Sequence, residues 1–388
     1  MKKWCWIFAF ACVAVASAAV TKSPPHGVFN VKESPPHGVF DVKEYGAVAD
    51  GKTDNMQVCF LGSMEGCMCM EGELEDGDTR RELLGWPVEF EGPCPNASPI
   101  VVQVKGPVKA TIDMNKYPSN EWTGRSVWHL NSCPSNANCK HLPTSITFYF
   151  VTNMTLRRIS SFDSKFFHIA MHGCKNVRAH YLRISSPANS PNTDGIHISS
   201  STGIKIAPSQ IGTGDDCISI GPGSHYIFIK NIFCGPGHGI SLGKYHTKED
   251  VSGLKVRNCT IFDTTNDVRI KTRPGSPSSS TTNFTFEDII MNNVLNSIII
   301  DQEYFPQSLC GSKPPSRVKI ENVTFKDIRG TSASMIAVIL LCSKNLPCRN
   351  FKLKNINLKY KGEAQSSLSF CSNVVGDSYG LQILPTCL

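Results

Sequence analysis

The amino-acid sequence predicts an all-β fold, a solenoid of stacked coils, on three observations. Asp194 and Asp216 lie 22 positions apart, as do Asp216 and His238, and a fixed period in the twenties is typical of stacked coils. Short β-branched segments recur from residue 146 onward, separated by Gly, Asn, Ser and Pro. No long amphipathic helical pattern interrupts them. A β-sandwich is the alternative, but it predicts hairpin spacing with Asn-Gly or Asp-Gly turns, which are rare here.

The N-terminus has the features of a secretory signal peptide over residues 1–18. Lys2 and Lys3 form a basic start, residues 4–15 form a short apolar run, and residues 16–18 form a small-x-small cleavage site. A membrane anchor is the alternative, but the run is shorter than the roughly 20 residues that a span needs. No later stretch is long enough to span either. The sequence therefore predicts a secreted, extracellular protein that is not associated with a membrane.

Residues 19–45 are predicted to be an N-terminal extension, because residues 23–33 are repeated at 34–44 with one change, Asn30 to Asp41. Residues 46–388 are predicted to form one solenoid domain. Within that domain residues 56–86 are atypical, because they show neither strand alternation nor a helical stripe. A disordered insert or a frame or splice disturbance is expected there, with an acidic metal-binding loop as the alternative.

The predicted strands follow one another through the rest of the domain. Corresponding segments return every roughly 23 to 35 residues, which fits coils whose turns vary in length. Many of the segments begin at an asparagine. The expected strands are residues 146–151, 177–184, 195–198, 204–206, 217–220, 226–229, 254–261, 267–271, 284–291, 298–301, 318–325, 335–341 and 351–358.

The charge of the chain suits an acidic partner without singling out nucleic acid. The formal charge of +7 falls to +5 once Lys2 and Lys3 leave with the signal. The remaining excess is scattered, and no Lys/Arg run with interleaved aromatic residues is present. The charge therefore favours an acidic polymer as the partner and no nucleic acid. We also expect a monomer.

Cysteines and glycosylation sequons agree with an oxidising, secretory environment. Of 17 cysteines, Cys5 and Cys12 lie in the signal, and many of the others should pair. The only close pair, Cys67 and Cys69, has no matching second pair, so a zinc site is not predicted. The short-range candidates are Cys133 with Cys139, Cys217 with Cys234, Cys342 with Cys348 and Cys371 with Cys387, and the Asn-x-Ser/Thr sequons start at Asn96, Asn153, Asn258, Asn283 and Asn322.

Three carboxylates are the core of the predicted site. Cleavage of a glycosidic bond needs one protonated carboxyl and one carboxylate that activates water or attacks. Crowded like charges raise at least one pKa, which keeps a proton available. Asp194 and Asp216 share a register and can hold a water jointly. Asp215 would point to the opposite face of an ideal strand, so it joins them only if the backbone bulges or the strand ends, which Gly212 and Gly214 permit. A turn or a calcium site is the alternative.

His238 is the fourth predicted catalytic residue. It lies between Gly237 and Gly239, which allow close backbone approach and an unusual turn. Its register with the aspartates favours a functional role over a purely structural one. It is expected to hydrogen-bond Asp215 or Asp216 and to tune where the proton lies.

Predicted binding residues follow in the next coils. Arg269 and Lys271 are two positions apart, so both project from one strand face, and together they suit the carboxylate of a sugar acid. A solvated strand face is the alternative for this pair. Tyr304 is expected either to contact a sugar or to pack. Asn192, in the motif of Asp194, is also assigned to substrate binding.

Four motifs in this order resemble a known family. They are Asn-Thr-Asp at 192–194, Gly-Asp-Asp at 214–216, Gly-His-Gly at 237–239 and Arg-Ile-Lys at 269–271. The chain is similar in these motifs to the polygalacturonases, glycoside hydrolase family 28. The resemblance covers roughly residues 88–388 and the short segment 46–54. Residues 298–304, Ile-Ile-Ile-Asp-Gln-Glu-Tyr, most resemble the plant exopolygalacturonases of pollen type.

The resemblance implies a fold and an activity. The fold would be a single-stranded right-handed parallel β-helix, a pectin-lyase-like solenoid, with the catalytic domain at 46–388. The activity would be hydrolysis, with inversion, of α-1,4-galacturonosidic bonds of polygalacturonate in the plant cell wall, by exo action. No metal and no cofactor are implied.

The resemblance also assigns roles to residues. Asp215 would be the general acid, Asp194 and Asp216 would activate the water, and His238 would assist the acid. Arg269 and Lys271 would bind substrate carboxylates, and Tyr304 would line the site. Cys217 and Cys234 match a disulfide of the family that braces the catalytic coil.

Three competing functions remain open at this stage. The first is endo action, because loops that close one end of the cleft decide the mode of cleavage. The second is a calcium-dependent pectate lyase, which would release an unsaturated product that absorbs in the ultraviolet and would stop on chelation. The third is a catalytically impaired wall protein that binds pectin without releasing reducing ends.

Overall fold

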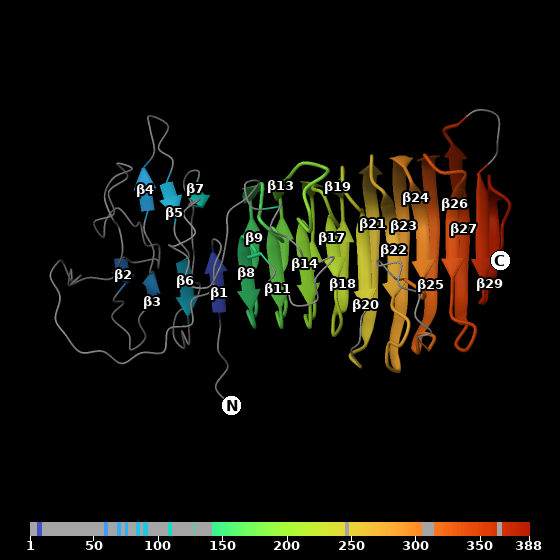
Figure 1. Ribbon diagram of the computed structural model, residues 1–388, viewed down its shortest axis with the longest axis horizontal. Coiled ribbons are helices and arrows are strands. Elements are labelled where there is room, and N and C mark those ends of the chain that lie inside the picture. The colour runs from blue at the N-terminus through green and yellow to red at the C-terminus, as the bar shows by residue number, and fades with distance from the viewer. Residues whose placement is uncertain are drawn as a thin grey trace.

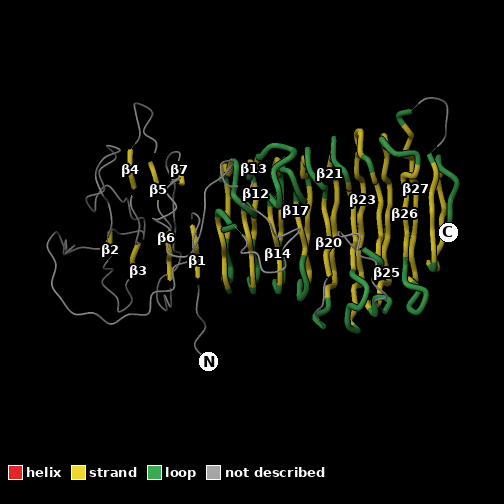
Figure 2. The backbone as a smooth tube through the Cα atoms, viewed as in Figure 1, coloured by secondary structure: helices red, strands yellow, loops and turns green. Residues whose placement is uncertain are grey.

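The computed structural model of the chain describes residues 142–244, 248–304, 314–362 and 367–388, together with Trp128 and seven short strands before residue 111. From residue 142 onward the strands stack side by side along one axis, with the C-terminus at one end (Figure 1). These residues contain no helix, and Figure 2 accordingly draws them as strands and loops alone. No helix in the described parts of the chain is long and apolar enough to cross a membrane.

The first of two long sheets carries the predicted site. Its strands from β8 onward pair in parallel, each with the strand one coil later. They are β8 (Ile146–Tyr149), β11 (Ile169–His172), β14 (Ile196–Ser199), β17 (Ile218–Ile220), β20 (Ile240–Lys244), β22 (Asn266–Thr272), β24 (Asn296–Asp301), β26 (Ile336–Leu341) and β28 (Leu368–Ser372).

The second sheet closes the other side of each coil. In the early coils two short strands contribute to it, and from β21 onward one long strand replaces them, since β21 pairs with both β18 and β19. Its strands are β9 (Thr155–Arg157), β10 (Ser160–Phe162), β12 (Arg178–His180), β13 (Arg183–Ser185), β15 (Lys205–Ile206), β16 (Ser209–Gly212), β18 (His225–Lys230), β19 (Ile232–Cys234), β21 (Val251–Phe262), β23 (Ser279–Val294), β25 (Val318–Ser332), β27 (Cys348–Tyr360) and β29 (Val374–Gln382).

Stacked β-branched residues fill the space between the sheets. Ile196 pairs in register with Ile218, and Ile218 with Ile240, and all three side chains are buried. In the second sheet the rings of Phe286 and Phe325 stack with their centroids 5.1 Å apart. Buried and less buried residues alternate along strands such as β14, and successive coils add apolar layers to one continuous core. The predicted solenoid is therefore confirmed.

The sequence pattern did not predict several of the strands. The pieces β9, β10 and β19 are three residues long, too short for alternation to register. Strands β28 and β29 carry exposed apolar and polar residues in mixed order at the end of both sheets.

Before residue 111 the structure contains short strands that the sequence did not indicate. Within 56–86, where no strand pattern was visible, β2 (Val58–Phe60) pairs with β3 (Met68–Met70) and β4 (Leu74–Asp76) pairs with β5 (Leu83–Gly85), both antiparallel. Three-residue strands do not produce a readable alternation. Strand β5 also pairs with β7 (Val108–Ala110).

Strand β1 (Trp6–Ala9) lies within the predicted signal peptide, between β6 (Val88–Glu91) and β8. Cleavage after residue 18 would therefore remove this strand from the sheet. The extension at 19–45, the sequon at Asn96 and the candidate pair Cys133–Cys139 lie outside the described residues.

Asparagine marks many corners of the coils. Among the described residues, twenty that are not glycine have a left-handed backbone, and eleven of them are asparagines, the side chain best suited to that conformation after glycine. Their amides form ladders from coil to coil; for example, Asn176 Nδ2 donates to Asn153 Oδ1 at 3.2 Å. The sequons at Asn153, Asn258, Asn283 and Asn322 all start at such corners. Their asparagines thus have a structural role, and their glycosylation stays a prediction.

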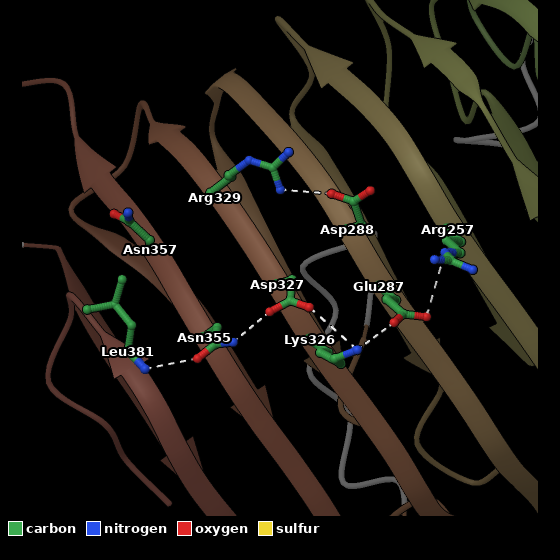
Figure 3. Close-up of a pocket in the computed structure, with 9 residues that line it drawn as sticks. All are labelled: Arg257, Glu287, Asp288, Lys326, Asp327, Arg329, Asn355, Asn357 and Leu381. Atoms are coloured by element: carbon green, nitrogen blue, oxygen red, sulfur yellow. Dashed lines mark hydrogen bonds and ion pairs between the residues drawn. The ribbon is translucent and has the colours of Figure 1, made fainter.

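Asn355 on β27 is one such corner, and Figure 3 shows it between two neighbours. Its φ is 55°, its Nδ2 donates to Asp327 at 2.6 Å, and its Oδ1 accepts from the Leu381 amide at 3.0 Å. Replacing Asn355 by Ala is expected to lower the free energy of unfolding by about 1–3 kcal/mol, because it removes two hydrogen bonds and strains the backbone. Urea denaturation measures this change.

The matched variant is Asn355→Gly, which keeps the left-handed backbone and loses only the hydrogen bonds. Its stability is expected to fall between those of the wild type and Asn355→Ala. Equal stability of all three proteins would contradict the structural role of the corner.

A cavity of about 530 Å³ lies on the second sheet and is lined mostly by charged residues, and Figure 3 draws these side chains. Its charges pair with one another: Lys326 Nζ lies 2.6 Å from Glu287 Oε1, and Arg329 Nη1 lies 2.8 Å from Asp288 Oδ1. Lys326 also contacts Asp327 at 3.5 Å. The first two ion pairs join β25 to its neighbour β23, whereas the third lies within β25. The charged side chains that line the cavity therefore form a network that links neighbouring coils.

Candidate active site

The aspartates and the histidine lie in successive turns that lead into the first sheet. Asp194, Asp216 and His238 each come two residues before a strand, namely β14, β17 and β20, which are neighbours in Figure 1. The backbone ladder already begins in these turns, because the Gly195 amide donates to the Asp216 carbonyl at 2.9 Å and the Cys217 amide to the Gly239 carbonyl at 2.8 Å. The 22-residue spacing therefore stacks the three side chains, although in turns and not on the strands as expected.

Asp215 reaches the site because the chain leaves strand geometry before it. Strand β16 ends at Gly212, and Asp215 lies in the turn before β17. Within the turn the Asp216 amide donates to Asp215 Oδ1 at 2.9 Å, and the Thr213 hydroxyl donates to the Asp215 carbonyl at 3.1 Å. A Cβ on Gly214 would lie 2.0 Å from the Ser190 carbonyl oxygen, so this turn requires glycine.

His238 and Asn192 both hydrogen-bond Asp215. His238 Nδ1 lies 2.8 Å from Asp215 Oδ1, and Asn192 Nδ2 donates to Oδ2 at 3.1 Å. The backbones are also close, because the His238 amide donates to the Asp215 carbonyl at 2.8 Å. Gly237, with φ of 143°, makes room: a Cβ there would lie 2.6 Å from that carbonyl oxygen. Of the two expected partners of His238, the structure thus shows Asp215.

These contacts decide the ionisation of Asp215. Burial alone would raise its pKa. The hydrogen bond and charge of His238, supported by the charges of Lys271 and Arg269, more than offset burial and hold the pKa below its ordinary value. In this structure Asp215 is therefore stabilised as the carboxylate.

Asp216 is held by two cations. Arg269 Nη2 lies 2.9 Å from its Oδ1, and Lys271 Nζ lies 3.4 Å from its Oδ2. The Arg269 and Asp216 side chains are only 8% and 4% exposed, which makes theirs a buried ion pair. Arg269 Nε also donates to the Ser241 hydroxyl at 3.1 Å. Arg269 and Lys271 share a face, as expected, and that face meets Asp216.

Asp194 has the opposite electrostatic setting. Burial and the negative charges of Asp215 and Asp216 raise its pKa well above the ordinary value, while a hydrogen bond from Ser219 and the charge of Lys271 partly oppose that rise. Three crowded carboxylates thus favour one shared proton, and in this structure the favoured position is Asp194.

Tyr304 lies against the two cations. Its ring centroid is 5.5 Å from Lys271 Nζ and 5.9 Å from the guanidinium carbon of Arg269. Both distances are within the range of cation–π attraction. The tyrosine therefore lies at the site and packs against Arg269 and Lys271.

Sequence reasoning missed three residues on the outward face of the first sheet. His197, Ser219 and Ser241 pair in register on β14, β17 and β20 and lie in one row with Arg269. They too are 22 positions apart, so the period that identified the aspartates also contained these residues. This spacing alone does not indicate a functional role, because serine is common on strands.

One group of possible metal ligands lies within the site. Ligand atoms of Asp215, Asp216 and His238 are within 4.8 Å of one another. However, Arg269 and Lys271 already neutralise Asp216, and positive charges so close oppose a divalent cation. The donor set fits proton chemistry better than metal binding.

A disulfide braces the turn that carries Asp215 and Asp216. Cys217, directly after Asp216, bonds Cys234 at the end of β19, with Cα atoms 6.0 Å apart. The structure also contains Cys342–Cys348 and Cys371–Cys387. Three of the four predicted short-range pairs are thus confirmed, and the fourth lies outside the described residues.

Comparison with known proteins agrees with the motifs and the fold. Residues 101–379 match the glycosyl hydrolases family 28. An exopolygalacturonase from Platanus acerifolia is 42% identical over 318 residues, 76% of this chain and 84% of that protein. A polygalacturonase from Gossypium hirsutum is 41% identical over 353 residues, 85% of this chain and 86% of that protein.

Among solved structures, polygalacturonase from Erwinia carotovora ssp. carotovora superposes with a TM-score of 0.57 at 26% identity, covering 70% of this chain and 69% of that one. Together with the parallel register, this likeness confirms the predicted right-handed parallel β-helix.

Proposed function

Because this chain belongs to the glycosyl hydrolases family 28, we propose that it hydrolyses α-1,4-galacturonosidic bonds of polygalacturonate. The observation that carries the proposal is the cluster of Asp194, Asp215 and Asp216 beside two cations, Arg269 and Lys271. The carboxylates supply acid and base, and the cations suit the carboxylate of a galacturonate unit. The names of the plant relatives support the same substrate.

In the proposed mechanism Asp215 donates a proton to the glycosidic oxygen as the bond to the anomeric carbon breaks. Asp194 and Asp216 hold a water on the other face of the sugar ring and take its proton as the water attacks, which inverts the anomeric carbon. His238 and Asn192 hold Asp215 in place through their hydrogen bonds.

Proton placement sets a condition on this mechanism. The shared proton favours Asp194 in this structure, whereas cleavage needs it on Asp215. Substrate binding must therefore shift the proton from the water-binding carboxylate to the acid. A substrate carboxylate beside Lys271 would favour this shift, because it competes for the positive charge that helps hold Asp215 ionised.

We further propose that the protein is secreted and acts on pectin in the plant cell wall by exo cleavage. The signal-like residues 1–18 and the disulfides support secretion. The likeness to an exopolygalacturonase supports exo action. Monomeric action and the absence of a metal or cofactor belong to the same proposal.

Product analysis tests the proposal. Purified protein is incubated with a defined oligogalacturonate, with and without chelator. Release of galacturonate monomer alone, unaffected by chelator and without ultraviolet absorbance, is the expected result. Mixed oligomers would mean endo action, and an absorbing, chelator-sensitive product would mean a lyase. Binding without new reducing ends would mean a wall protein that does not cleave.

A further inference from the structure

A hydrogen-bonded chain leads from the outer face of the first sheet to Asp194, a buried carboxyl of the site. His197 on β14 pairs in register with Ser219 on β17, and its Nδ1 lies 2.8 Å from the Ser219 hydroxyl oxygen. The same hydroxyl hydrogen-bonds the carboxyl of Asp194. His197 therefore reaches Asp194 through one serine.

Aromatic packing fixes the imidazole plane. The ring of Phe167 stacks on His197 at 4.7 Å between centroids, with 20° between planes, and Phe166 stacks on Phe167 at 3.9 Å. Burial, with the nearby charges of His172 and Lys271, lowers the pKa of His197 to about 4. Above that pH the imidazole is neutral and carries a single N–H.

Counting donors fixes the direction of the chain. A serine hydroxyl has one hydrogen to donate, and an ionised carboxylate only accepts. When Asp194 is ionised, Ser219 must donate to it, so the Ser219 oxygen is left to accept from His197 Nδ1–H. A hydrogen bond that is itself polarised by a second donor is stronger than an isolated one.

We propose that His197 and Ser219 are positioning residues that orient Asp194 and stabilise its ionised, water-activating form. This inference rests on the proposed function, in which Asp194 must be ionised to accept the proton of the water. It gives a purpose to the histidine and the serine, which the mechanism does not otherwise use.

The charges that face Asp194 define the sign of the effect. Asp215 and Asp216 raise its pKa, and Lys271 and Ser219 lower it. Removing the serine, or the histidine that polarises it, leaves Lys271 alone to oppose burial and the repulsion, and this raises the pKa of Asp194 further. Asp194 then ionises only at higher pH, so the acid limb of the kcat/KM profile moves to higher pH.

The test measures kcat/KM against pH for single and double variants. Ser219→Ala and His197→Leu are expected to move the acid limb up by about one pH unit. The double variant should move it no further than Ser219→Ala alone, because both changes act through one bond. His197→Asn, whose amide places an N–H near the position of Nδ1, should restore the wild-type limb.

A matched control lies on the second sheet. His225 and Ser252 form the same kind of bond, also at 2.8 Å and between neighbouring coils, but on β18 and β21. Replacing His225 by Leu should leave the profile unchanged. If His197→Asn shifts the limb as far as His197→Leu, or if the double variant is additive, the histidine acts by packing and the inference is overturned.

A second readout needs no turnover and so separates this inference from the proposed function. In protein labelled with ¹⁵N-histidine, the chemical shift of His197 Nδ1 is expected to show that this atom carries the proton at neutral pH. The same shift should change with pH as Asp194 ionises. That titration should vanish in both Asp194→Asn and Ser219→Ala. If the titration persists in Asp194→Asn, the hydrogen-bonded chain from His197 to Asp194 is overturned, even if the protein hydrolyses galacturonan. If the titration is lost in that variant, the chain is supported, even if the protein does not hydrolyse galacturonan.

Discussion

Replacing Asp215 by Asn is expected to lower kcat on polygalacturonate about 10²- to 10⁴-fold, the usual contribution of a general acid. Asparagine has the same shape and can still accept from His238 and from the Asp216 amide. Its new amide group can pair with the Asn192 side chain after that side chain turns over. Folding should therefore be unchanged, and thermal unfolding checks this.

A substrate with a better leaving group distinguishes the general acid from the residues that activate the water. An aryl galacturonide with an acidic phenol needs no protonation of the leaving oxygen, so the Asp215→Asn variant should recover most of its rate on it. Asp194→Asn should stay slow on both substrates, because it impairs the attacking water. Recovery by Asp194→Asn but not by Asp215→Asn would exchange the two roles and would agree with the proton position favoured in this structure.

The control for surface charge is Asp263→Asn. Asp263 lies at a corner of the second sheet and accepts from Asn293 Nδ2 at 2.7 Å. Its replacement should leave kcat unchanged. Full activity of the Asp215 variant on polygalacturonate would remove Asp215 from the mechanism.

The sequence predicted the stacking of the site because that stacking follows from a constant coil length. Asp194, Asp216 and His238 are 22 residues apart, and the structure pairs the strands that follow them in that register. The irregular backbone at Asp215 was also predictable, since two glycines precede it and a strand cannot present adjacent residues on one face.

The partners of individual charges were not predictable. Arg269 pairs in register with Ser241, 28 positions earlier, so it lies off the 22-residue period. Its ion pair with Asp216 depends on how far a long side chain reaches across two strands. The favoured proton on Asp194 depends on burial and repulsion summed over three carboxylates, which only coordinates provide.

Replacing Arg269 by Leu is expected to damage both stability and activity. It would leave the carboxylate of Asp216, 4% exposed, with only Lys271 at 3.4 Å. Breaking a buried ion pair from one side costs about 3–5 kcal/mol, because the remaining charge stays buried. The free energy of unfolding in urea should fall by about that amount, and kcat/KM should fall as well, since Asp216 would lose the geometry that holds the water.

Two further substitutions separate charge, geometry and binding at this position. Arg269→Lys keeps the charge but cannot bond Ser241 and Asp216 together from one planar group, so it should recover only part of the lost stability. Lys271→Ala, which removes the longer contact, should raise KM more than it lowers stability. If Arg269→Leu unfolds at the same urea concentration as the wild type, the buried pair does not stabilise the site. If KM is unchanged in Lys271→Ala, Lys271 does not bind substrate, and the galacturonate assignment loses part of its chemical basis.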